Sequence, residues 1–144
     1  MGAAARRLCK RLGRRGTALA ILGPAKVCFG LGYALQPAPD PAGLGLLTRY
    51  ADIRCWSYVW ILCGLVTFTC AWLRIGRDGL GFFTALIPPF VWGAAFLWGG
   101  LTGEYPRGLA IAAWYGIGHV ILILFLATLP EHSIPHLARR ERGR

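Results

Sequence analysis

Long apolar runs separated by short polar segments dominate the chain. Four runs contain almost only apolar residues, and they cover residues 17–35, 55–73, 80–101 and 108–129. An α-helix needs roughly 20 such residues to cross a hydrocarbon core about 30 Å thick. The pattern therefore predicts an all-α fold, a polytopic integral membrane protein with four transmembrane helices.

The segments between the runs agree with this arrangement. Residues 74–79 and 102–107 are long enough only for tight turns, whereas residues 36–54 form a longer connection that begins with three closely spaced prolines. Prolines exclude a helix there. Four apolar residues in its second half fall near one helical face: Leu46, Leu47, Tyr50 and Ile53. They indicate either a short helix lying on the membrane surface or an ordinary polar loop.

Composition and charge add the orientation. The chain of 144 residues is 56% hydrophobic and 15% charged, with a mean hydropathy of +0.50. Twelve of its 16 basic residues flank one side of the predicted bundle, in the tails at residues 1–16 and 130–144 and in the turn at 74–79. Three flank the other side, and Lys26 lies within a span. Because basic residues stay cytoplasmic, both chain ends are predicted to be cytoplasmic.

Reporter fusions test this orientation. Fusions after residues 13, 42, 76, 103 and 144 are expected to report in, out, in, out and in, because each span reverses the side of the chain. The measurement is the activity of paired reporters that work on only one side of the membrane. A carboxy-terminal tail cleaved by protease added from outside would contradict the orientation.

The net charge of +10 does not predict a nucleic-acid partner. The basic residues lie at the ends of the spans, where topology and attraction to anionic lipid explain them. The predicted partner is the lipid bilayer. The five cysteines and three histidines show no spacing typical of a metal or redox site, so the sequence predicts no cofactor and no enzyme.

Two polar residues interrupt the spans at similar depth. Lys26 lies nine residues past Thr17, or roughly 13 Å into the first span, where a lysine costs about 3 kcal/mol. Gly23 and Gly30 share its face and allow another helix to approach, so Lys26 is expected to face the bundle. His119 lies near the middle of the fourth span. The pair is either a polar centre of a pore or proton path, or two tolerated polar residues.

Small residues and prolines predict how the helices pack. Gly108, Ala112 and Gly116 repeat every four residues, a spacing that favours close helix contact and self-association into a homo-oligomer. Pro88 and Pro89 remove two backbone donors from the middle of the third span. They predict a kink or a break there.

The stretch "GRRGTALAILGPAKVCFGLGYAL", the proline-rich turn and the run from "CWSYVWILCG" to "FVWGAAFLWG" resemble small multi-spanning membrane proteins of actinobacteriophages. Abundant Ala, Gly and Arg with no Asn also indicates a GC-rich genome. The resemblance implies a non-enzymatic, holin-like protein in the cytoplasmic membrane of a bacterial host. The alternatives that stay open are a small transporter or channel subunit and a membrane scaffold or exclusion protein.

Overall fold

The computed structural model describes residues 3–37, 40–73 and 78–130, with side chains from residue 12 onward. The described residues form helices and connecting turns, without a strand. Their order is α1 (Ala3–Ala34), α2 (Gly45–Thr48), α3 (Ile53–Cys70), α4 (Gly79–Leu101), α5 (Gly108–Ala113), a π-helix η1 (Trp114–Ile121) and α6 (Leu122–Thr128).

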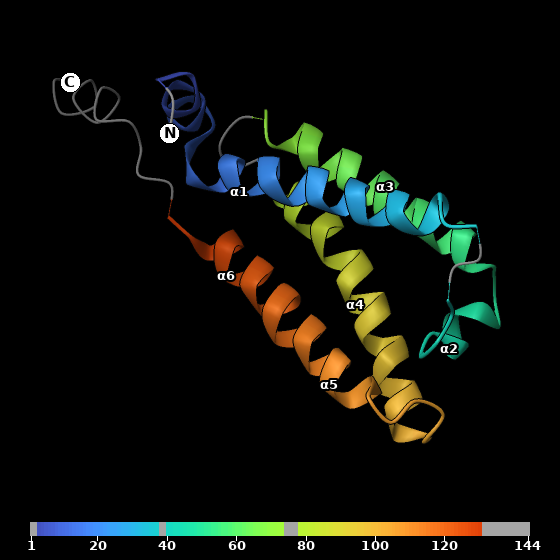
Figure 1. The fold of residues 1–144 in the computed structure, drawn as a ribbon. Coiled ribbons are helices and arrows are strands. Elements are labelled where there is room, and N and C mark those ends of the chain that lie inside the picture. Colours follow the sequence, from blue (N-terminus) through green and yellow to red (C-terminus); the bar gives the residue numbers. More distant parts are fainter. Residues whose placement is uncertain (1–2, 38–39, 74–77, 131–144) are drawn as a thin grey trace, which may run out of the picture.

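Four helical segments are long and apolar enough to cross a membrane, as predicted. They are Leu12–Ala34, Ile53–Cys70, Gly79–Leu101 and Gly108–Thr128. The last one is the continuous run of α5, η1 and α6. The start of α1 and the end of α6 lie at one end of the bundle, and the connections through α2 and between α4 and α5 lie at the other (Figure 1).

The first helix is longer than its predicted span. It begins at Ala3, and Gly13 interrupts it with a φ of 70° and a ψ of −174°. Glycine adopts this positive φ without the strain that a Cβ would cause. The hydroxyl of Thr17 donates to the freed Gly13 carbonyl at 2.6 Å, and the helix continues directly after the kink.

Helices α1 and α3 lie side by side along most of their length (Figure 1). Their contact is antiparallel and repeats every seven residues on both helices. A Cβ on Gly16, Gly23 or Gly30 would lie 2.8–2.9 Å from a carbonyl oxygen of the small residue opposite. The residues opposite are, in the same order, Ala71, Gly64 and Ser57. A seven-residue repeat is the spacing that keeps two helices in contact at a crossing angle of about 20°.

Helix α4 is continuous from Gly79 to Leu101 and contains both prolines. The two prolines therefore do not break the helix, and the kink at Pro88 and Pro89 stays a prediction. Hydrocarbon offers no replacement partners to a broken helix, so continuing the helix with two missing hydrogen bonds costs less than opening it. Thr84 bonds back to the carbonyl of Leu80 at 3.0 Å and contacts the hydroxyl of Thr67 on α3 at 3.2 Å.

The connection that contains α2 packs against the core of the protein. Leu44, Leu47 and Ile53 are buried against Trp92 and Phe96 of the core. The indole of Trp56 donates to the carbonyl of Leu47 at 2.9 Å and fixes this contact. A short helix does form here, as one of the two predicted arrangements requires, and its position at the membrane surface stays a prediction.

An ion pair joins α1 to α4 at the end of the bundle where the described chain begins. Arg15 donates to both carboxylate oxygens of Asp78, at 2.6 and 3.2 Å. Its guanidinium also lies 5.2 Å from the ring centre of Phe82. A two-pronged pair of this kind sets the relative position of two helices more strictly than a single bond does.

Candidate functional site

A cavity lies at mid-depth between α1, α3 and the π-helix η1. Its volume is about 330 Å³. Both polar residues that the sequence singles out, Lys26 and His119, line it. Aromatic rings form much of the remaining wall, from Phe29, Trp60, Trp114 and Tyr115. The structure thus brings the two predicted polar residues to one site.

Lys26 faces the bundle, as its glycine neighbours predict. Its exposed fraction is 4%. The close contacts at Gly23 and Gly30 hold α1 against α3 on this face, so the lysine side chain extends along Trp60. Its ammonium lies 5.2 Å from the ring centre of Trp60. A cation over an indole face is stabilised by about 0.5–2 kcal/mol, which offsets only part of the cost of burial.

The π-helix determines how His119 is placed. Bonds from residue i to i+5 bring side chains five apart next to each other. The ring of His119 accordingly lies 5.9 Å from Trp114 and also 5.3 Å from Tyr115, measured between ring centres. Short π-helical turns inside membrane helices often mark functional positions. Here the turn gathers Trp114, Tyr115 and His119 at one cavity.

The polar groups at this cavity lack partners. Nδ1 of His119 is buried and has no partner of good hydrogen-bond geometry in the described part of the chain, while the imidazole contacts the backbone of Trp114. Over residues 12–37, 40–73 and 78–130, neither the ammonium of Lys26 nor the hydroxyl of Tyr115 makes a hydrogen bond or ion pair. Buried polar groups are normally paired, so Nδ1 of His119 and Nε1 of Trp60, which lack partners at one cavity beside Lys26 and Tyr115, indicate a polar guest.

The cavity has a buried inner wall and an exposed outer rim. Lys26, Trp60 and Tyr115 are buried, whereas Trp114 on the rim is 66% exposed. Leu122, also on the rim, is exposed. In a membrane this outer surface faces lipid, so the cavity opens sideways toward the hydrocarbon between α1 and the fourth span.

The predicted small-residue seam of the fourth span makes a close helix contact at one end only. Gly108 packs against α4, where a Cβ would lie 2.7 Å from the backbone nitrogen of Gly100. A Cβ on Gly116 would meet nothing within 4 Å. At that level Tyr115 contacts Gly93 of α4 instead. The seam therefore opens from Ala112 toward Gly116.

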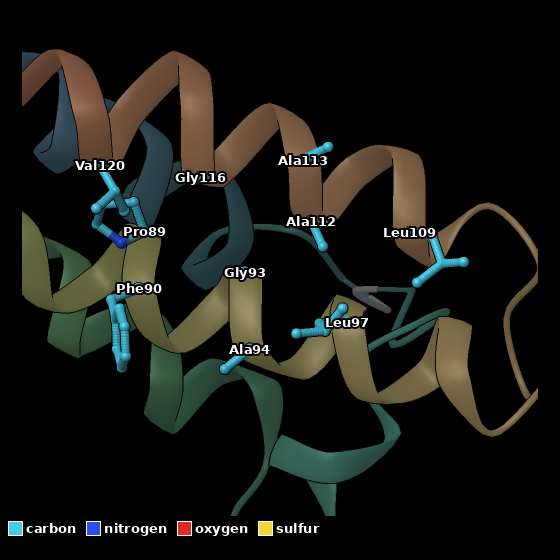
Figure 2. A pocket seen from close by; sticks show the side chains of 10 residues that line it. All are labelled: Pro89, Phe90, Gly93, Ala94, Leu97, Leu109, Ala112, Ala113, Gly116 and Val120. Carbon is cyan, nitrogen blue, oxygen red and sulfur yellow. The ribbon is translucent and has the colours of Figure 1, made fainter.

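An apolar groove lies where the fourth span separates from α4. Ten residues of α4 and the fourth span line a volume of about 480 Å³ (Figure 2). Ala112 and Gly116 are among them, and the buried Pro89 forms part of the floor. Two of the three seam residues and one of the two prolines thus border a single groove.

Sequence reasoning missed three features of the helix packing and the site. It named Gly23 and Gly30 but not the full heptad from Gly16 to Gly30 with Ser57, Gly64 and Ala71 opposite, although the spacing is legible in both spans. It did not predict the π-helix, for which no simple sequence signal exists. It also assigned no role to Trp60, whose ring carries the contact with Lys26.

The described residues contain no group of three or more His, Cys, Asp or Glu side chains that could hold a metal ion. In the part of each span that the structure describes, the cysteines are free thiols, at Cys28, Cys55, Cys63 and Cys70. Comparison of the chain with known protein families, with curated protein sequences and with solved structures gives no match.

Proposed function

We propose that the protein is a non-enzymatic, holin-like membrane protein that associates with copies of itself in the cytoplasmic membrane of a bacterium. The observation that carries this proposal is the open groove between α4 and the fourth span. Helices associate in lipid mainly through close packing, which small residues permit. The groove walls contain Gly93, Ala94, Ala112, Ala113 and Gly116.

A second copy of the chain is the occupant that fits this groove best. Phe90 borders the groove and is 66% exposed, so an aromatic side chain stands directly beside the small-residue hollow. A protruding and a hollow surface on the same face allow two copies to meet through a two-fold axis, each filling the other. Self-association of this kind needs no catalytic group.

A second candidate function is a small transporter or channel subunit. The cavity around Lys26 and His119 favours it, because polar side chains within a membrane span commonly mark a path for ions or substrates. The two candidates place the working residues on different faces of the protein. Substitutions in the groove and in the cavity therefore separate them.

Inducing the protein alone in a bacterium is expected to collapse the membrane potential and stop growth, and an added endolysin is expected to cause lysis. Gly116→Leu should abolish these effects, because the leucine fills the groove that the second copy needs. The measurements are a potential-sensitive dye and optical density after induction, with chemical crosslinking in isolated membranes to follow the dimer.

Gly32→Leu is the matched control. Gly32 lies on the outer face of α1, and a Cβ there meets nothing within 4 Å, as at Gly116. Both variants should fold, but only Gly116→Leu should lose the crosslinked dimer and the effect on potential. Normal growth with an intact potential at high expression of the unaltered protein would refute the holin-like proposal.

A further inference from the structure

We propose that the cavity around Lys26 and His119 binds the ring of a lipid-soluble quinone. This cavity is distinct from the groove proposed for self-association, because different residues line it. The quinone is bound here without a redox step.

The polar groups of the cavity call for a ligand that accepts hydrogen bonds. Lys26 offers only donors, and the Tyr115 hydroxyl and His119 Nδ1 can each donate. Within the described residues neither Lys26 nor the Tyr115 hydroxyl makes a hydrogen bond, and His119 Nδ1 has no partner of good geometry. No Asp or Glu lies within any of the four spans, so no protein carboxylate is at hand to accept these bonds. A carbonyl oxygen has two lone pairs, so one that lies between Lys26 and His119 would accept from both of them.

The aromatic walls of the cavity favour a ligand that contains a flat ring. Phe29, Trp60, Trp114 and Tyr115 surround the polar groups, and Trp60 lies 4.3 Å from Phe29 between ring centres. Aromatic side chains stabilise a stacked or edge-on ring by about 0.5–1.5 kcal/mol for each pair, beyond the apolar area buried. A quinone ring carries carbonyl acceptors on opposite edges of a flat apolar face, which matches this combination.

The depth of the cavity in the membrane favours a quinone over an anionic lipid as its ligand. Lys26 lies eight residues before the end of α1 at Ala34, which is about 12 Å along the helix axis. His119 lies eleven residues after Gly108, at about 16 Å from the same end of the bundle. A charged headgroup stays at the membrane surface, because burying its charge is costly. A neutral ring with an isoprenoid tail resides at this depth and can enter through the sideways opening.

The test uses the full chain in phosphatidylcholine nanodiscs with an azido-quinone photoprobe, and mass spectrometry locates the labelled peptides. We expect saturable labelling of peptides from α1 and η1 that excess decylubiquinone removes and excess oleate does not. Lys26→Met should weaken binding about tenfold or more, because it removes a charged hydrogen-bond donor. His119→Leu should weaken it as well.

Cys28→Met is the matched control, because Cys28 lies two residues from Lys26 on the exposed side of the same helix. It should leave binding unchanged, and so should Gly116→Leu in the apolar groove. Labelling that rises in proportion to the quinone in the bilayer without saturating would overturn the proposal for the unaltered protein. Competition by oleate but not by decylubiquinone would overturn it in favour of a carboxylate ligand. Equal binding by Lys26→Met and Cys28→Met would overturn the role of the lysine.

Discussion

Gly64→Leu is expected to destabilise the protein by about 3 kcal/mol, because it forces apart two backbones that touch. A Cβ on Gly64 would lie 2.7 Å from the carbonyl oxygen of Gly23 and 2.9 Å from the backbone nitrogen of Val27. Backbone atoms in the middle of a helix cannot move aside as a side chain can. The α1–α3 pair must therefore separate at its central contact, and with it the wall that holds Lys26 over Trp60.

The measurement is unfolding by added SDS in mild-detergent micelles, followed by tryptophan fluorescence. Gly116→Leu and Gly32→Leu are the controls, because at both positions a Cβ meets nothing within 4 Å. Replacing glycine within a helix adds about 0.5–1 kcal/mol of helix stability, so both controls should unfold slightly later than the unaltered protein. An unchanged midpoint for Gly64→Leu would contradict the tight α1–α3 contact.

The four spans could be predicted from the sequence because the hydrocarbon core of a membrane restricts the length, polarity and secondary structure of any segment that crosses it. Each span must be about 20 apolar residues long and helical, since lipid supplies no hydrogen-bond partners. The predicted and observed spans agree within a few residues, apart from the earlier start at Leu12. The same rule explains why Pro88 and Pro89 fail to break α4, a consequence that local proline chemistry alone does not reveal.

The contacts between spans were less predictable, because they depend on residues distant in the chain. Leu47 lies in a segment of mixed polarity, and only Trp92 and Phe96 of α4 make it part of the core. The small residues of the fourth span indicate a close contact, but Tyr115 takes the place expected for Gly116. Tyr115 replaces Gly116 at this contact because a π-helix has more residues per turn than an α-helix. The π-helix itself depends on packing and has no sequence motif.

The candidate site could be predicted in part. Polar residues within apolar spans are conspicuous, and a similar depth in the membrane suggests that Lys26 and His119 meet. Depth alone does not give the angular position of a side chain around its helix. Gly23 and Gly30 supplied that information for Lys26, because they fix which face of α1 approaches α3. No comparable signal fixed the face of His119.

Lys26→Leu is expected to improve membrane insertion of the isolated first span by about 3 kcal/mol, more than a hundredfold in the insertion equilibrium. Lysine near the centre of a span is among the costliest residues, whereas leucine is favourable. The measurement is a glycosylation-mapping insertion assay on residues 12–34 in a host protein. Cys28→Leu on the same helix is the control and should shift insertion by well under half as much, because cysteine carries no charge.

The full-length protein is expected to respond less strongly, and the difference is informative. Lys26 is buried against Trp60, so its removal also loses a contact of about 0.5–2 kcal/mol. With no native hydrogen bond to break, Lys26→Leu should nevertheless be neutral or stabilising by about 1 kcal/mol in SDS unfolding. Such a result would mean that Lys26 lowers stability while the cavity is empty. Residues of this kind commonly serve function at the cost of stability, here the binding of a ligand or the passage of an ion. Destabilisation by more than about 2 kcal/mol would instead make Lys26 part of a bonded structural network, and the cavity would then serve packing.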